Sequence, residues 1–440
     1  MRHLTFLLLI SLMVSTLVPI PATAQDPVDA QLKRLSTLFV AEPAAVLPGG
    51  YADLFAPSFR QAVPDAQLTA IFLQYWSQGG SVVEMETVSK SGPYQGVFTL
   101  VFEKGIQVPV KNISVTSEAP HLISGVLLGL PEPVQRVADV PELATEFASR
   151  PGSVSFMAAR VAPDGSLDAL GGVDTHQALG LGSAFKLFVL GRLVADVEAG
   201  DRSWDDVIEI DPRLKSLASG ITQAWPDRSP ATLHTLATLM ISVSDNTATD
   251  ALVHELGRDR VAAFQTEMGH TRAQLNDPFL TTREMFVIKS DSSMAAEYAG
   301  AVPAARRSML DSIADAQPDG ALFPTTPTYI ETIEWFASAQ DMSRVMAWFT
   351  GGSTGDTPAR AQAREILAVN PGLDFDTEAW PYIGYKGGSE PGVLNMTFLL
   401  QSADGDWYVL TASQNNPAAA IDQISFSSLM KQAARLLTQP

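Results

Sequence analysis

The sequence predicts an α+β protein of two domains, and three observations support that fold class. The chain has 440 residues, which is more than one ordinary hydrophobic core accommodates. The pattern changes at Pro131-Glu132-Pro133, where a series of short alternating strands stops. In the segment beyond it, strands are expected at both ends and amphipathic helices in the middle. This order predicts one antiparallel sheet built from both ends of a domain, flanked by an all-helical lobe.

The first predicted domain spans residues 28–135 and places helices before strands. Apolar residues at helical spacing predict a helix at 64–79. Alternating apolar residues then predict strands at 82–89, 96–102, 106–115 and 121–128. A helix followed by a curved antiparallel sheet resembles the cone-like fold of nuclear-transport-factor-like (NTF2) and ketosteroid-isomerase-like domains.

The second predicted domain spans residues 142–440. It opens with a strand at 154–161 and a hairpin turn at Asp164-Gly165. Apolar periodicity predicts helices at 183–198, 232–243, 246–256 and 258–268. The closing strands are expected at 380–385, 393–401 and 407–413, and a final helix at 424–437.

Residues 1–24 have the pattern of an export signal. Arg2 and His3 precede an apolar run, and the small residues of Pro21-Ala22-Thr23-Ala24 provide a cleavage site. The run is too short for a stable membrane anchor. We therefore expect a protein that is exported to the periplasm or secreted.

Composition excludes several classes of function. A net charge of -19 argues against a nucleic-acid partner, because a phosphate-binding surface needs clustered Lys and Arg. The chain has no cysteine, so it has no thiol nucleophile and no disulfide. Its 6 histidines are isolated from one another, so we expect no metal and no cofactor.

Three short motifs carry the chemistry. Ser183-Ala184-Phe185-Lys186 begins an apolar helix, where a serine and a lysine three residues apart share one face. A lysine whose pKa is lowered by burial can take the proton of the serine hydroxyl. Alone, the same residues would fit a helix cap and a lysine that reaches solvent.

The second motif, Ser244-Asp245-Asn246, stands between two predicted helices. Its hydroxyl can relay a proton and its amide can bind a substrate carbonyl, although these residue types also cap helices. The third motif, Lys386-Gly387-Gly388-Ser389, is expected where a strand ends. Its glycines allow a substrate to lie close, and the Ser389 N–H can face an oxyanion; a glycine turn is the alternative.

The three motifs together, in this order, favour a serine acyl-enzyme hydrolase. From about residue 142 to 437 the chain resembles the penicillin-recognising serine hydrolases, that is, class A β-lactamases and low-molecular-weight penicillin-binding proteins. With the first domain included, it looks most like two-domain β-lactamase-like proteins associated with clavulanic-acid clusters.

The resemblance implies a role for each motif residue. Ser183 would be the acylated nucleophile and Lys186 its general base. Ser244 would pass a proton to the leaving group, Asn246 would bind the substrate amide, and Lys386 would attract a substrate carboxylate. Gly388 would let the substrate approach, and the backbone N–H groups of Ser183 and Ser389 would form the oxyanion hole.

Two departures from the family pattern leave the substrate open. Gly387 replaces a residue that usually carries a hydroxyl, and the water-activating Glu-x-x-x-Asn loop of class A enzymes is missing. Asp277, Glu331 and Glu390 are the acids considered in its place. The expected substrate is a small molecule or peptide with an acyl group: a β-lactam, an ester or a cell-wall peptide. A D,D-peptidase and a sensor that stays acylated remain alternatives.

Overall fold

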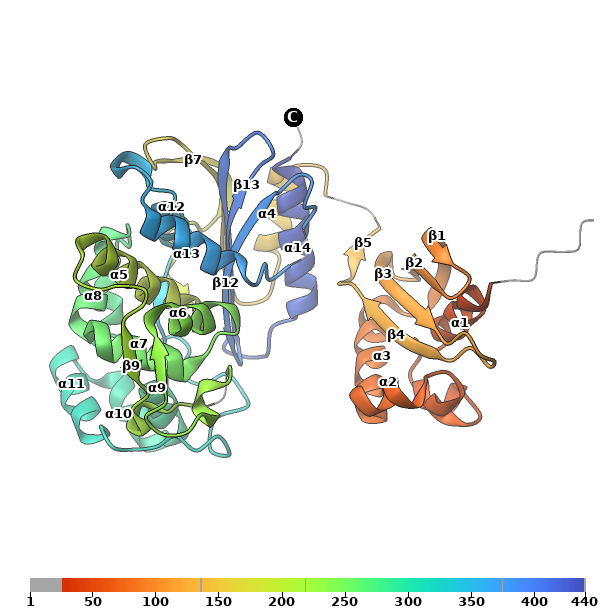
Figure 1. Cartoon of the computed structure of the whole chain (residues 1–440), viewed down its shortest axis with the longest axis horizontal. Coiled ribbons are helices and arrows are strands. Elements are labelled where there is room, and N and C mark those ends of the chain that lie inside the picture. Colours follow the sequence, from red (N-terminus) through yellow and green to blue (C-terminus); the bar gives the residue numbers. More distant parts are fainter. Residues whose placement is uncertain (1–25, 135–136, 218, 374, 439–440) are drawn as a thin grey trace, which may run out of the picture. The chain divides into compact units, whose positions relative to one another are not determined.

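The computed structural model describes residues 26–134, 137–217, 219–373 and 375–438, so the expected export signal at 1–24 lies outside it. The chain divides into two compact units, residues 1–135 and 136–440, and both combine helices with antiparallel sheet (Figure 1). The predicted α+β class is therefore confirmed. No helix in the part of the chain that the structure describes is long and apolar enough to cross a membrane.

In the described residues of the first unit, three α-helices precede a curved sheet. The sheet has the order β1-β2-β3-β4, with β5 paired to β3, and its register shifts at several points, as in a curved sheet. Apolar side chains of α1 and α3 pack with those of β2 and β3 in one core. This arrangement is compatible with the expected cone-like fold. The elements are α1 (Pro27–Ser36), α2 (Pro57–Ala62), α3 (Asp65–Gly79), β1 (Val82–Gly92), β2 (Gln95–Phe102), β3 (Ile106–Val115), β4 (Ile123–Leu128) and β5 (Glu132–Pro133).

The second unit follows the predicted order of strands, helices and strands. Its strands are β6 (Ser153–Val161), β7 (Leu167–Val173), β8 (Leu179–Gly180), β9 (Val207–Glu209), β10 (Pro230–Thr232), β11 (Phe336–Ala337), β12 (Tyr382–Glu390), β13 (Val393–Gln401) and β14 (Trp407–Asn415). Its helices are α4 (Val140–Ala148), α5 (Lys186–Ala199), α6 (Leu233–Ser242), α7 (Asn246–Leu256), α8 (Arg258–Glu267), α9 (Thr282–Ser290), α10 (Ser292–Gly300), α11 (Pro303–Ser312), α12 (Ala339–Trp348), α13 (Pro358–Ala368) and α14 (Gln423–Leu436). The 3-10 turn η3 (Gly182–Phe185) precedes α5.

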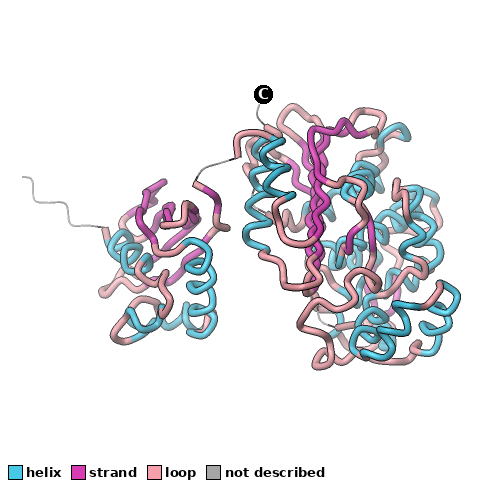
Figure 2. Tube along the Cα trace, turned by 180° about the vertical axis from the view of Figure 1, so that it is seen from behind, coloured by secondary structure: helices cyan, strands magenta, loops and turns pink. Residues whose placement is uncertain are grey.

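The main sheet of this unit has the order β12-β13-β14-β6-β7 and is antiparallel throughout. Strands from both ends of the unit therefore meet in one sheet, as the sequence predicts. Helices α4 and α14 cover one face, and α12 and α13 with the helical lobe lie on the other (Figures 1 and 2). The lobe encloses a large apolar core around α5, α6 and α7.

Local sequence explains the helix boundaries in the lobe. Thr232 and Asp245 cap α6 and α7 by accepting hydrogen bonds from backbone N–H groups of the first turn. Thr281 and Glu284 form a capping box at the start of α9. These caps hold the loops that precede each helix, including the loop with Ser244.

Two expected boundaries differ from the structure. The helix expected from Ser183 begins at Lys186, and Ser183 lies in η3 instead. The third motif does not end its strand: β12 continues through Lys386 to Glu390, and the whole motif pairs with β13. Residues 386–389 are therefore held by a sheet ladder, which rules out the glycine turn considered as the alternative.

We expect Phe147→Ala to destabilise the second unit by about 3–5 kcal/mol, because its ring is fully buried. The ring stacks on Phe156 at 4.3 Å between centroids and meets Phe426 edge-on at 5.8 Å. Urea denaturation measures the change. Leu170→Ala, at a position on β7 that is 46% exposed, is the control and should cost far less; equal losses would contradict the packing described here.

Candidate active site

The turn that carries Ser183 is buried on both sides of this residue, but Ser183 itself is partly exposed. Gly182 has a φ of 51°, in the left-handed region that favours glycine. Ser183 follows, partly exposed, while Ala184 and Phe185 are buried. Residues three apart in a 3-10 turn lie one above the other, so η3 puts Ser183 and Lys186 on the same side.

Strand β12 passes very close to this turn. A β-carbon at Gly388 would lie 2.6 Å from the backbone nitrogen of Ala184 and nearer still to that of Ser183. A β-carbon at Gly182 would lie 2.6 Å from the backbone nitrogen of Ser389. Only glycine fits at either position, and the backbone amides of Ser183 and Ser389 lie on two segments in direct contact.

Lys186 is completely buried, and its ammonium group contacts the second motif. Nζ donates to the backbone oxygen of Ser244 at 2.6 Å, to the Ser244 hydroxyl at 3.2 Å and to Asn246 Oδ1 at 2.7 Å. Burial, with a smaller contribution from the charge of Lys386, places the pKa of Lys186 well below its ordinary value; the charges of Asp250 and Asp245 oppose this shift.

Lys386 approaches the same hydroxyl from the strand. Its Nζ donates to Ser244 Oγ at 3.1 Å and to the backbone oxygen of Gly387 at 2.6 Å. Burial lowers the pKa of Lys386 to about 7. Two lysine amines of lowered pKa therefore share one serine hydroxyl as a hydrogen-bond partner.

The backbone at Ser244 is strained and firmly held. Its φ of 58° lies in the left-handed region, which costs a non-glycine residue of order 1–3 kcal/mol. The next residue, Asp245, is fully buried and accepts hydrogen bonds from Ile221 N, Thr222 N, Thr222 Oγ1 and Ala248 N. Asp245 therefore anchors the loop that points Ser244 at the two lysines.

The structure brings all the predicted site residues into one cluster. Hydrogen bonds join Lys186 to Ser244 and Asn246, and Lys386 to Ser244. The close approach at Gly388 adds Ser183 and Ser389 to this cluster.

Each of the three acids considered for water activation either is paired with a basic side chain or is exposed to solvent. Asp277 forms an ion pair with Arg307 at 2.6 Å. Glu331 is exposed. Glu390 pairs with the buried Lys289, and burial together with the charge of Glu334 holds the pKa of Glu390 well above its usual range. A carboxyl that keeps its proton is a poor base.

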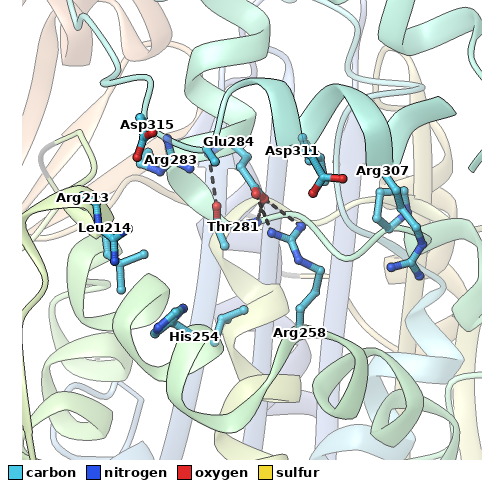
Figure 3. Close-up of a pocket in the computed structure, with 14 residues that line it drawn as sticks. Arg213, Leu214, His254, Arg258, Thr281, Arg283, Glu284, Arg307, Asp311 and Asp315 are labelled. Atoms are coloured by element: carbon cyan, nitrogen blue, oxygen red, sulfur yellow. Dashed lines mark hydrogen bonds and ion pairs between the residues drawn. The ribbon is translucent and has the colours of Figure 1, made fainter. Parts of the chain in front are cut away.

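A cavity of about 540 Å³ in the helical lobe is lined by none of the residues of the three motifs (Figure 3). Arg258 and Glu284 lie next to each other in its wall, and Arg258 donates to Glu284 Oε2 at 2.9 Å. Arg283 donates to the backbone oxygens of Ile313 and Ala316. The charged side chains that line this cavity thus stabilise the helical lobe. In the described ranges, no group of three or more His, Cys, Asp or Glu side chains is arranged to hold a metal ion.

Sequence reasoning did not predict that the aromatic-rich segment before β11 supports the nucleophile turn. Trp335 is buried and stacks on Phe185 with 3.7 Å between ring centroids. Glu334 Oε2 accepts a hydrogen bond from Gly182 N at 3.1 Å. The aromatic-rich stretch around residues 329–341 was the available signal, but the pairing of β11 with β8 that brings it to the turn has no local signature.

Comparison with known proteins agrees with this architecture. The family model described as "Beta-lactamase enzyme family" matches residues 140–439. No curated protein matches the chain. A solved beta-lactamase from Sphaerobacter thermophilus DSM 20745 is 17% identical with a TM-score of 0.50, over 69% of this chain and 96% of that one.

Two further solved structures are similar at lower scores. A beta-lactamase from Chitinophaga pinensis DSM 2588 is 14% identical (TM-score 0.47, 68% of this chain and 96% of that one). The protein PBP-A is 16% identical (TM-score 0.47, 69% and 98%). The family match extends over most of the chain and includes all three motifs. The chain therefore belongs to the beta-lactamase enzyme family, whose fold is that of serine hydrolases.

Proposed function

We propose that this protein is an exported serine hydrolase that cleaves a β-lactam, amide or ester through an acyl intermediate on Ser183. One observation carries the proposal: two buried lysines of lowered pKa converge on the hydroxyl of Ser244, beside the turn that holds Ser183. Export rests on the signal-like residues 1–24 and on the family.

In the first step, neutral Lys186 takes the proton of the Ser183 hydroxyl as Ser183 Oγ attacks the substrate carbonyl carbon. A lysine needs a free electron pair for this, which its lowered pKa supplies. The carbonyl oxygen becomes negative and accepts hydrogen bonds from the amides of Ser183 and Ser389. One such donor contributes about 3–4 kcal/mol to the transition state.

In the second step, the bond between the carbonyl carbon and the leaving nitrogen or oxygen breaks. The leaving atom takes a proton from Ser244 Oγ, and Ser244 is reprotonated by a lysine to which it is hydrogen-bonded. The products are an ester on Ser183 and a released or ring-opened leaving group. Asn246, already fixed by Lys186, offers its amide group to the substrate.

Release of the acyl group by water is the slow step in this proposal. Asp277 is ion-paired, and Glu390 is held protonated, so neither is free to activate water. This observation favours, as the second candidate, a sensor or a D,D-peptidase that turns over β-lactams poorly. Release of D-alanine from a cell-wall-like peptide separates a peptidase from a sensor.

Intact-protein mass spectrometry tests the nucleophile. We expect a fluorescent penicillin or a chromogenic cephalosporin to add one acyl group to the wild-type protein and none to Ser183→Ala, because that variant lacks the attacking oxygen. Asp205→Ala, at an exposed site in the same unit, is the control and should still form the adduct. Adduct formation by Ser183→Ala would remove Ser183 from this role, and product without a lasting adduct would indicate efficient deacylation.

Lys186→Ala should slow acylation by about 100-fold or more, because the proton acceptor is lost. Stopped-flow measurement of adduct formation gives the rate. A rate equal to that of the wild-type protein would contradict the assignment of Lys186 as the general base.

The lowered pKa of Lys386 predicts a pH-dependent gain in stability for Lys386→Met. Between the folded pKa of about 7 and the ordinary lysine pKa of 10.5, the unfolded chain binds one more proton than the folded chain, so the stability of the wild type rises with pH relative to the variant. The stability advantage of Lys386→Met should therefore be larger at pH 7.5 than at pH 9.5, by about 2 kcal/mol. Urea titrations at both pH values measure it, with Lys215→Met as a control for loss of a lysine; equal differences at the two pH values would contradict the shift.

A further inference from the structure

Three ionisable side chains that the reaction does not use are buried beside the nucleophile turn. Glu334 is 4% exposed and Lys289 3% exposed, and the side chain of Glu390 is 7% exposed. They come from different parts of the chain: Lys289 from the last turn of α9, Glu334 from the residues before β11, and Glu390 from the end of β12. Burying such groups is costly unless they are paired, so their arrangement needs an explanation.

Glu334 is bonded directly to the turn before the nucleophile. Its Oε2 accepts from Gly182 N at 3.1 Å and from Trp335 N at 3.0 Å. The backbone oxygen of Trp335 accepts from Leu181 N at 2.9 Å. Gly180 allows this approach, since a β-carbon there would lie 3.2 Å from Glu334 Cγ. The Glu334 segment thus fixes both residues that precede Ser183.

Glu390 belongs to the other half of the oxyanion site. It directly follows Ser389 on β12 and pairs with Lys289. Glu334 is bonded to Gly182, which lies against the backbone of Ser389, so the carboxyl groups of Glu334 and Glu390 reach the same buried region. Besides burial, the charge of Glu334 and a hydrogen bond to its side chain raise the pKa of Glu390, and two carboxyl groups can form such a bond only through a proton. Glu334 Oε1 is buried and receives no N–H or hydroxyl donor in the described part of the chain, which leaves it open to accept a proton from a neighbouring carboxylic acid.

We propose that Glu334 and Glu390 share one proton and are positioning residues for the oxyanion hole, holding the amide of Ser183 and the amide of Ser389 at a constant separation. The inference rests on the proposed acyl transfer at Ser183. Glu334 is hydrogen-bonded to the turn that precedes Ser183, and Glu390 is part of strand β12. The shared proton therefore links the turn to the strand. Together with the ammonium group of Lys289, the two carboxyl groups and their one proton carry no net charge, which suits their burial.

This arrangement makes acylation sensitive to alkaline pH. The charged groups that act on Glu390 are Glu334 and Lys289. When the shared proton is lost, two carboxylates in contact repel each other and one lysine neutralises only one of them. The turn and the strand then separate, and the rate of acylation falls as pH rises.

The test uses the full-length protein and the fluorescent penicillin. Acylation rates are measured at saturating probe from pH 5.5 to 9.5 for the wild type, Glu390→Gln, Glu334→Ala and Glu297→Gln. Gln at 390 keeps a donor for Glu334 and an acceptor for Lys289 but cannot ionise. Glu297 is an exposed acid on α10, so its change to Gln is the matched control.

We expect Glu390→Gln to raise the ratio of the rates at pH 9 and pH 7 at least threefold over the wild type, with Glu297→Gln unchanged. Glu334→Ala, which leaves Gly182 N unpaired, should lower the saturated rate more than tenfold while the half-saturating probe concentration changes less than threefold. If the acid pair had only a structural role, Glu390→Gln would not change the pH dependence of the acylation rate. If the wild type forms the adduct and both Glu390→Gln and Glu334→Ala show the same pH dependence of the acylation rate as the wild type, the positioning role alone is overturned. If the wild type forms no adduct, the proposed function is overturned and this role with it.

Infrared spectroscopy provides a readout that needs no substrate and that survives a poorly folding variant. At pH 8.5, where the buried Asp250, whose pKa is raised to about 7, is ionised, the wild type should show the carbonyl band of a protonated carboxylic acid and Glu390→Gln should lack it. A wild type without the band would show that the two carboxyl groups share no proton and would overturn the inference.

Discussion

The close approach of η3 and β12 at Gly182 and Gly388 is the constraint on which the site depends. Two backbone segments about 200 residues apart in the chain meet with no side chain between them. The contact sets the spacing of the Ser183 and Ser389 amides, and it also fixes where Lys386 can enter. Any added β-carbon would push the turn away from the strand. The rest of the second unit supports this contact: β12 is held by the sheet, and η3 by α5 and the core beneath it.

Around this contact the protein buries two lysine amines. Lys186 and Lys386 both reach Ser244 Oγ, and each amine is removed from water. Desolvation lowers both pKa values, and the charge of Lys386 adds to the shift at Lys186. The strained backbone at Ser244 belongs to the same arrangement. The lobe around α5, α6 and α7 provides the apolar burial that outweighs these costs.

The helical segment between α8 and α12 connects the nucleophile turn to the end of β12. It provides Lys289, which pairs with Glu390, and Glu334 and Trp335, which hold Leu181, Gly182 and Phe185. Burial and the charge of Glu334 keep Glu390 protonated, so it cannot act as a base for water. A site that is well arranged for acylation, while Asp277 is ion-paired and Glu390 is protonated, is consistent with slow release of the acyl group.

The sequence by itself determined the elements and the motifs. The periods of apolar residues placed α3, α7, β3 and β13 closely, because local patterns of burial follow directly from the alternation of each structure. Three motifs at element boundaries were enough to predict which residues meet. Only the tertiary structure decided how they meet: that Lys386-Gly387-Gly388-Ser389 lies inside a strand, that Ser183 sits on a 3-10 turn, and that Glu334 and Glu390 come into contact. Strand pairing, burial and the sharing of a proton all depend on contacts between residues that are far apart in the sequence. No local pattern in the chain encodes such contacts.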